Sequence, residues 1–308
     1  MKIYKLRVKP KASQITPWHS DTILGSLCWI YVQKEGEAKL KELFNLYDNE
    51  QFPFVVSEAF PEDLIVKPMA GNLFSIDKSA VKEQALNTAE KAKKAKKIDL
   101  LNIEEFNTII NGGQVQLIPK AVEKEDVGVM HNQINRLTGA TVDGGLYEQH
   151  ETFWGDGHLS IYAGVEDKWL DRLYNLFEQL SLRGIGKRAS VGKGAFDIID
   201  FVEFTGFKIP DQPNCFVSLS NYIPKKTDPV QGQYKIHVKY GKLGQAYAHA
   251  DNPFKKPLLM LKPGAVFWTD KPQHAYGRLV YSVSDTYPEV VQIGSTLAIP
   301  ARLQNPDI

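Results

Sequence analysis

The segment SLRGIGKRASVGKGAFDI, residues 181–198, combines the two kinds of residue that bind phosphate groups. Glycine lets backbone N–H groups approach a ligand because it has no Cβ, and lysine and arginine supply the opposite charge. The residues that could contribute are Arg183, Gly184, Gly186, Lys187, Arg188, Ser190, Gly192, Lys193 and Gly194. The segment therefore predicts a loop that binds phosphate-bearing ligands. The alternative is a solvated turn whose glycines only allow tight packing.

The loop does not fit the common phosphate-binding motifs. A Walker loop has four residues between its glycines and a Ser or Thr after its lysine, whereas here five residues separate Gly186 from Gly192 and Gly194 follows the lysine. Ala189 occupies the third glycine position of a dinucleotide-binding motif, and Arg188 the first glycine position of a nucleophile elbow. What remains is a flexible, basic connection between a predicted helix and a predicted strand.

The neighbouring segments predict the scaffold that positions this loop. The expected elements are a strand at 2–10, a helix from Ser20, strands at 52–61 and 157–165, a helix at 166–184 and a strand at 195–204. Ser20 is a good N-cap, and apolar residues recur at helical spacing in both helices. The order strand–helix–strand–strand–helix–strand is typical of the ferredoxin-like or RRM-like sandwich.

Two further regions complete the predicted architecture. The first is a long insertion, with glycine-broken hairpins expected at 111–119 and 136–149 and a lysine-rich stretch, Lys91–Lys97, that is either a solvated face or a nonspecific RNA contact. The second is a strand-rich C-terminal part, interpreted as a degenerate copy of the same fold. We therefore predict an α+β protein with two ferredoxin-like (RRM-like) domains in tandem. They are residues 1–205, with the insertion at about 60–155, and residues 206–308.

Composition limits the class of protein. With 43% hydrophobic and 24% charged residues in 308, the chain is globular, and its net charge of +1 means that any nucleic-acid surface must be local. Two distant cysteines, Cys28 and Cys215, argue against a disulfide framework and favour a cytoplasmic protein. We expect no signal peptide and no membrane segment. The two histidines of HETFWGDGH fit no helix-face metal site, so we expect neither metal nor cofactor.

Four passages together resemble one protein family. The loop pattern G-x-G-x-x-x-S-x-G-x-G resembles the glycine-rich loop of RAMP proteins, the RNA-binding subunits of CRISPR effector complexes. SDTILGSLCW (20–29), NRLTGATVDGGLY (135–147) and NPFKKPLLMLKPGAVF (252–267) are similar to segments of the RAMP subunit that caps the crRNA 5′ end in type III-A (Csm) complexes. The loop alone is common to all RAMP proteins, but the four passages in this order are more specific.

The resemblance implies that the chain binds RNA without turning it over. Such a subunit holds the repeat-derived 5′ tag of the crRNA and joins the large polymerase-like subunit to the first backbone RAMP subunit, while neighbouring subunits cleave the target. Further contacts are then expected from Ser20 and Asp21 at a helix N-terminus, Arg136 in a glycine-flanked turn, and Lys255 and Lys256 between two prolines. Each also has an ordinary interpretation, as an N-cap or a solvated charge.

The main rival is a metal-independent endoribonuclease, because some RAMP relatives process precursor crRNA. That chemistry needs a general base near the 2′-OH, usually histidine, and a cation for the transition-state phosphate. Among the seven histidines, His19 and His131 lie near the candidate segments, yet the sequence ties neither to a Lys or Tyr. More than a hundred residues also follow the loop, which lies close to the C-terminus in processing RAMPs. We therefore expect a non-catalytic subunit. A small-nucleotide-binding regulator is a third class, without an adenine-specific feature to support it.

Overall fold

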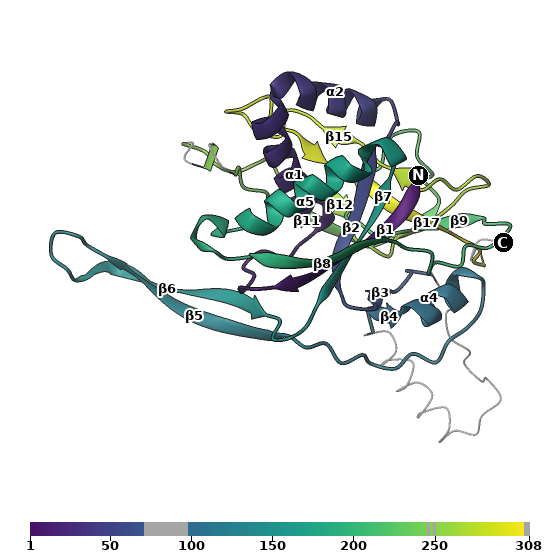
Figure 1. Ribbon diagram of the computed structural model, residues 1–308, viewed down its shortest axis with the longest axis horizontal. Helices are drawn as coiled ribbons and strands as arrows, with labels where there is room; N and C mark the ends of the chain where they lie inside the picture. The colour runs from purple at the N-terminus through teal and green to yellow at the C-terminus, as the bar shows by residue number, and fades with distance from the viewer. Residues whose placement is uncertain (71–97, 245–246, 249–250, 305–308) are drawn as a thin grey trace.

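The computed structural model describes residues 1–70, 98–244, 247–248 and 251–304 (Figure 1). The fold is a mixed α/β arrangement with several antiparallel sheets. The first sheet has four strands in the order β2-β7-β1-β8. Its strands are β1 (Lys2–Pro10), β2 (Phe54–Pro61), β7 (Leu159–Val165) and β8 (Phe196–Glu203). The expected strands of the first half are therefore confirmed.

Two helices complete the strand–helix–strand–strand–helix–strand order around this sheet. They are α1 (Ser20–Glu35) and α5 (Leu170–Arg183), which contact one another and the sheet. Ile23, Leu24 and Leu27 of α1 are fully buried, as their helical spacing predicts. Helix α5 follows a 3₁₀ turn, Asp167–Trp169, and a second helix, α2 (Glu37–Asp48), follows α1 directly.

Residues 62–158 lie between β2 and β7 and hold elements of which the sequence analysis predicted only part of one hairpin. These elements are β3 (Leu64–Val66), β4 (Leu100–Asn102), α4 (Ile103–Ile110), β5 (Glu125–Ile134) and β6 (Thr141–Phe153). Helix α4 begins with a capping box, because the side chains of Asn102 and Glu105 each accept a backbone N–H of the other. The hairpin expected at 111–119 is wrong, since that segment contains no strand. Lys91–Lys97 lies outside the described residues.

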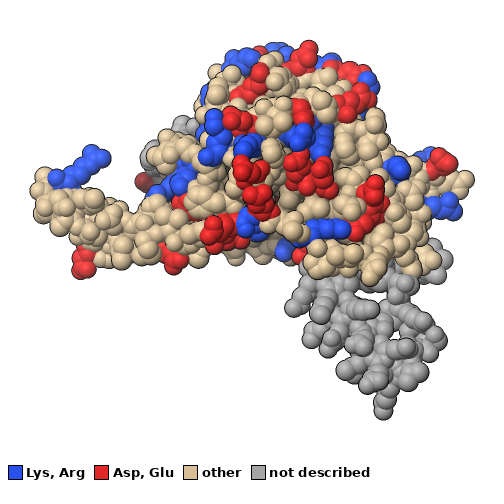
Figure 2. All heavy atoms as spheres, turned by 60° about the horizontal axis from the view of Figure 1, so that its bottom comes forward, with Lys and Arg blue, Asp and Glu red and all other residues tan. Residues whose placement is uncertain are grey.

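The hairpin β5–β6 projects from the body as a long arm (Figure 1). The segment 136–149 supplies its turn and part of its second strand, so this hairpin prediction is confirmed in part. Arg136 is the only lysine or arginine between Glu125 and Phe153. Figure 2 accordingly shows an arm that is mostly uncharged, while positive and negative side chains are mixed over the body.

The second sheet has five strands in the order β10-β13-β9-β17-β14, and no α-helix follows Arg183 in the described part of the chain. Its strands are β9 (Cys215–Ser218), β10 (Gly232–Gln233), β13 (Val266–Trp268), β14 (Ala275–Tyr276) and β17 (Thr296–Ala301). Two ribbons accompany it, β11 (Ile236–Lys239) with β12 (Leu258–Leu261), and β15 (Leu279–Val280) with β16 (Gln292–Ile293).

The hydrophobic core is continuous between the two sheets. One cluster of buried side chains contains Leu6 and Ile161 of the first sheet together with Leu297 and Ile299 of the second. The contact is close: a Cβ built on Gly164 of β7 would lie 3.0 Å from the Leu297 side chain. The two sheets therefore share apolar surface, and neither completes its core alone.

This shared core predicts that damage in the second sheet destabilises the whole chain. Leu297 is fully buried, so Leu297→Ala should lower the free energy of unfolding by about 2–5 kcal/mol. Urea unfolding followed by fluorescence and by circular dichroism should give one coincident transition for the variant. Ile236→Ala, at a side chain that is 55% exposed, is the control and should change little. Two separate transitions, with only one shifted, would contradict a shared core.

Candidate nucleic-acid interface

The loop between α5 and β8 is folded tightly on itself by its glycines. Gly184 and Gly194 have φ of +77° and +68°, a region that favours glycine. Ile185 N–H donates to the Gly194 carbonyl at 3.0 Å, and a Cβ on Gly194 would lie only 2.2 Å from the Ile185 carbonyl oxygen. Residues 185 and 194 thus form a closed neck, and residues 186–193 project from it.

Two backbone N–H groups of this loop donate hydrogen bonds to the segment after β1. Lys187 N–H donates to Thr16 Oγ1 at 3.1 Å, and Gly194 N–H donates to the Ser13 carbonyl at 3.0 Å. Gly186, with φ +95°, lies so close that a Cβ there would meet Thr16 at 2.8 Å. The position of the loop is therefore set by residues 13–16, a role that the sequence analysis did not assign to them.

The tip of the loop carries the groups that remain available to a ligand. Arg188 has φ +60°, and a single 3₁₀ turn, Ala189–Val191, follows it. In the described part of the chain the N–H groups of Arg188, Ala189 and Ser190 have no internal hydrogen-bond acceptor. Lys187 and Ser190 are exposed. Three consecutive N–H groups beside a free ammonium form a surface suited to a phosphate.

Arg188 connects the loop to the hairpin arm. Its guanidinium donates to the Tyr147 hydroxyl and approaches His131 Nδ1 at 3.4 Å, and it lies 5.8 Å from the centre of the Tyr147 ring. The His131 and Tyr147 rings are stacked, with centroids 5.4 Å apart. The sequence analysis found no histidine tied to a tyrosine, because these two residues meet only through the register of β5 and β6.

Lys193 has partners within the protein, and its predicted RNA contact stays a prediction. Its ammonium contacts Glu151 Oε2 at 2.6 Å and Ser13 Oγ at 2.8 Å. The Glu151 side chain is fully buried on β6. Burial alone would raise the pKa of Glu151, but the bonds from Lys193 and Ser13 hold that pKa below its ordinary value. Lys193 therefore neutralises a buried carboxylate and ties the loop to the arm. Arg183, at the end of α5, is exposed and donates to Gln33 of α1.

Ser20 and Asp21 are not at an RNA-accessible surface, so both predictions are corrected. The N-cap of α1 is His19, and Ser20 is its first helical residue and is fully buried. Ser20 N–H and Oγ both donate to Glu58 Oε1, at 3.1 and 3.2 Å, and Ser20 Oγ accepts the Asn221 N–H at 3.0 Å. Residues from the second half of the chain therefore cover this helix end.

Asp21 is the centre of that buried contact. Its carboxylate accepts hydrogen bonds from Asn221 Nδ2 at 3.2 Å and Gln292 Nε2 at 2.9 Å, and Lys239 Nζ lies at 2.8 Å. Burial alone would raise the pKa of Asp21, but the Lys239 charge and the hydrogen bonds lower it below the ordinary value. The carboxylate is thus ionised and fully partnered.

The remaining predicted residues lie apart from the loop. Arg136 is exposed in the turn of the arm, beyond the strand residues that contact the loop. Lys255 Nζ lies 3.0 Å from Gln292 Oε1, and burial lowers its pKa to about 8; its predicted RNA contact stays a prediction. Lys256 is exposed and pairs with Asp285 at 2.7 Å.

The described residues also bear on two other kinds of site, metal centres and membrane spans. Within the described ranges, no group of three or more His, Cys, Asp or Glu is placed to hold a metal ion. None of the described helices is long and apolar enough to cross a membrane. The loop and the arm therefore remain the main candidate site.

Comparison with known proteins gives this site a family context. No model of a known protein family matches the chain. A curated relative, "CRISPR system Cms protein Csm4" of Thermococcus onnurineus (strain NA1), is 26% identical over 219 residues, which is 68% of this chain and 70% of the relative. The fold matches a chain of a Csm1–Csm4 cassette crystallised with pppApA, with a TM-score of 0.66, 16% identity and 99% of both chains covered.

A second solved structure agrees with the first. A chain of the Csm3–Csm4 subcomplex of the type III-A CRISPR-Cas interference complex matches with a TM-score of 0.62 and 14% identity, over 97% of this chain and 99% of that one. At such identities the structures establish the fold, and the sequence match establishes the relationship. The chain therefore has the fold of these proteins from type III-A CRISPR complexes. The chain is homologous to Csm4.

The neck of the loop predicts different costs for two glycine substitutions. Gly192 and Gly194 both have positive φ, but a Cβ on Gly192 meets nothing within 4 Å, whereas one on Gly194 overlaps a backbone carbonyl. Gly192→Ala should cost about 1–2 kcal/mol of stability through its backbone conformation alone. Gly194→Ala should cost about 1–3 kcal/mol more through the overlap. Urea unfolding measures both, and equal costs would contradict the closed neck.

The Asp21 contact predicts an acid-sensitive part of the stability. Asp21→Asn should cost about 3–5 kcal/mol at pH 7, because it leaves the Lys239 charge without its partner. Since the folded pKa of Asp21 is lowered, its contribution is present above about pH 3.9 and is lost as the pH falls below that value. The difference between wild type and variant should therefore shrink in urea titrations at lower pH. Asp285→Asn, which removes the exposed partner of Lys256, is the control. A pH-independent difference would contradict this assignment.

Proposed function

We propose that the chain is a non-catalytic, RNA-binding subunit of a type III-A CRISPR interference complex that anchors the repeat-derived 5′ tag of the crRNA. The observation that carries the proposal is the tip of the glycine loop, where the N–H groups of Arg188, Ala189 and Ser190 lie beside the exposed Lys187. The homology to Csm4 supplies the context. In this proposal the first sheet belongs to a ferredoxin-like RAMP domain, and the second to a degenerate copy of it.

The chemistry of the loop suits a sugar–phosphate chain better than a single small anion. The unpartnered N–H groups of the loop and the Lys187 ammonium can bind one phosphate. Arg188 extends the positive surface toward the arm. Single-stranded RNA is commonly held by such backbone contacts together with aromatic surfaces for its bases. Tyr147 is 41% exposed beside the loop and offers such a surface.

The same homology supports two protein partners. Solved structures of similar fold come from a Csm1–Csm4 cassette and a Csm3–Csm4 subcomplex. We therefore propose that the chain joins the large polymerase-like subunit to a backbone RAMP subunit. The surface carries apolar side chains that a partner could cover, among them Val238 and Leu259, which pair across β11 and β12 and are 45% and 66% exposed.

A metal-independent endoribonuclease is the second candidate, and one contact favours it. His131 stacks on Tyr147 and lies against Arg188, which brings together a base, a hydroxyl and a cation. His131 Nε2, however, lies 3.7 Å from the buried Glu151 carboxylate, and Arg188 already contacts both rings. These groups are engaged with one another, which makes the binding role the better supported one.

One experiment separates binding from cleavage. The purified protein is mixed, without divalent metal, with an end-labelled RNA that carries a repeat-derived 5′ tag. The proposed subunit should retain the RNA intact. A product that ends in a cyclic phosphate, lost in His131→Ala, would establish the nuclease instead. RNA that is neither retained nor cut would contradict both candidates.

The loop predicts a charge-dependent loss of RNA retention. Lys187→Glu places a negative charge beside the free N–H groups, so retention should fall about 10-fold or more, and the salt dependence of binding should weaken. Fluorescence anisotropy with labelled RNA measures the effect. Lys41→Glu, an identical charge change at an exposed position of α2, is the matched control and should bind as wild type. Thermal stability should stay near wild type in both variants. Equal retention by both would contradict the loop assignment.

A further inference from the structure

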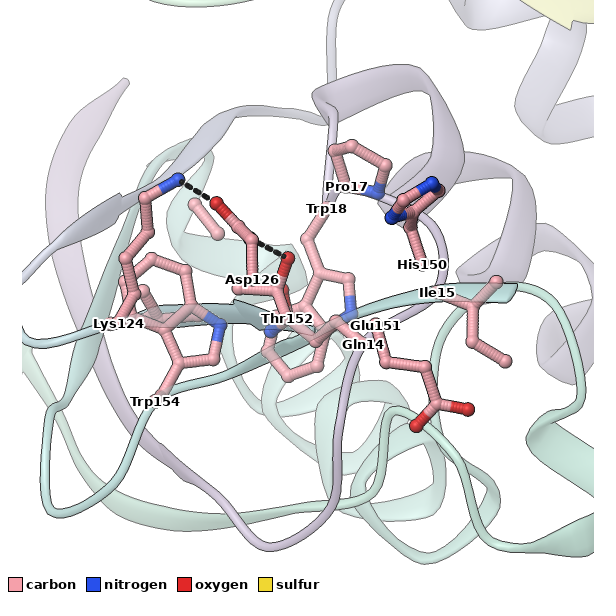
Figure 3. A pocket seen from close by; sticks show the side chains of 12 residues that line it. Gln14, Ile15, Pro17, Trp18, Lys124, Asp126, His150, Glu151, Thr152 and Trp154 are labelled. Carbon is pink, nitrogen blue, oxygen red and sulfur yellow. Dashed lines mark hydrogen bonds and ion pairs between the residues drawn. The ribbon is translucent and has the colours of Figure 1, made fainter. Parts of the chain in front are cut away.

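A cavity of about 370 Å³ lies where the hairpin arm leaves the body, and none of the predicted site residues lines it. Its walls come from the segment 14–18 after β1, from the body ends of β5 and β6, and from one residue each of β2 and β7 (Figure 3). Ligand pockets commonly span about 300–1,000 Å³. A cavity at the lower end of that range suits one flat ring system.

The walls have the character of an aromatic binding site. Ile15, Pro17 and Leu159 supply aliphatic surface, and the indoles of Trp18 and Trp154 supply two aromatic rings. In Figure 3 the Glu151 carboxylate points away from these two rings. Trp154 is only half-buried, which leaves part of its ring open to a stacking partner.

Three N–H donors in these walls have no acceptor among the described residues. They are Gln14 Nε2, Trp18 Nε1 and Trp154 Nε1. Gln14 and Trp18 are only 5% and 3% exposed, so these donors are withdrawn from water as well as from protein acceptors. Buried donors normally find a partner. Donors without a partner, in an apolar aromatic cavity, are chemically matched by a planar ligand that carries carbonyl or ring-nitrogen acceptors.

The polar rim shows that the cavity is not a general cation or anion site. Asp126 accepts from Thr152 Oγ1 at 2.6 Å and from Lys124 Nζ at 3.1 Å, so the opposite charges at the mouth neutralise one another. His150 is exposed beside them. A neutral ring fits this rim better than an ion does.

The cavity is connected to the glycine loop through Glu151 of its wall and through Thr16, which is adjacent to two wall residues in the chain. Thr16, which accepts the Lys187 N–H, stands between Ile15 and Pro17 of the cavity wall. Glu151, which binds Lys193, belongs to the opposite wall. The loop and the cavity are therefore held by the same two segments, residues 13–18 and the body end of β6.

We propose that this cavity receives one unstacked nucleobase of the RNA that the loop holds. The base stacks on Trp154, and its acceptors meet the unpartnered donors of Gln14 and the two indoles. This inference rests on the proposed RNA-binding function and adds a base subsite to it. Single-stranded RNA is recognised by splaying bases out onto aromatic side chains in this manner.

An abasic scan tests the base subsite. A set of tag RNAs, each lacking the base at one position, is bound to the full-length wild type, to Trp154→Leu and to Trp154→Phe. In wild type, one position should weaken retention about 5- to 150-fold, the range given by base–aromatic stacking. That position should have no effect in Trp154→Leu, which should bind intact RNA as weakly as wild type binds the abasic RNA. Trp154→Phe keeps a ring and should retain part of the effect.

The controls separate this proposal from the function on which it rests. Trp29 is another half-buried tryptophan; it lies on α1 and packs against Tyr247. Trp29→Leu should therefore reproduce the wild-type scan. Lys187→Glu should weaken all RNAs alike. If wild type retains RNA but no position is sensitive, or if Trp154→Leu keeps the sensitivity, the base subsite is wrong and the RNA-binding function stands.

A second probe covers the case in which wild type retains no RNA, which would overturn the proposed function. The four nucleoside monophosphates are then titrated separately while tryptophan fluorescence is recorded. Quenching in wild type that is absent in Trp154→Leu would support the base subsite. No response to any of the four would overturn it.

Discussion

Two buried carboxylates at the start of helix α1 join the halves of this protein. Glu58 accepts from Ser20 and from the Asn221 backbone, and Asp21 accepts from Asn221, Lys239 and Gln292. A buried charge is tolerated only when it is well partnered, and removing one partner is costly. This requirement fixes where the second half lies against α1. The shared apolar core then fills the space between the two sheets.

The requirement that a buried charge has a partner also separates the cations of the glycine loop into two groups. Lys193 is committed to the buried Glu151, and Arg188 to Tyr147 and His131, so both hold the arm against the loop. Lys187 has no such commitment among the described side chains and is exposed. The residues whose contacts hold the loop in place are thus different from the residue whose charge is available to bind a ligand. A basic residue in a glycine-rich motif is not by itself evidence of a ligand contact.

Local pattern predicted the first sheet, its two helices and the loop, because spacing of apolar residues and glycine content are local properties. It did not predict the partners of Asp21 or Lys193, since those contacts join positions far apart in the chain. Helix α4 was not predicted, although Asn102 and Glu105 form a capping box at its start. The tandem-domain boundaries and the RNA contacts stay predictions.

The pairing of Asp21 with Lys239 has a consequence for how the chain is made. The two residues are 218 positions apart, whereas the first sheet is complete in sequence at Glu203, 36 residues before Lys239. At translation rates of about 5–20 residues per second, the nascent first half waits about 2–7 seconds with an unmatched carboxylate before its ammonium partner is synthesised. The emerging polypeptide therefore passes through an interval in which its earliest helix has been synthesised but the residues that cover it have not, when a chaperone or a ribosome-associated factor could engage it.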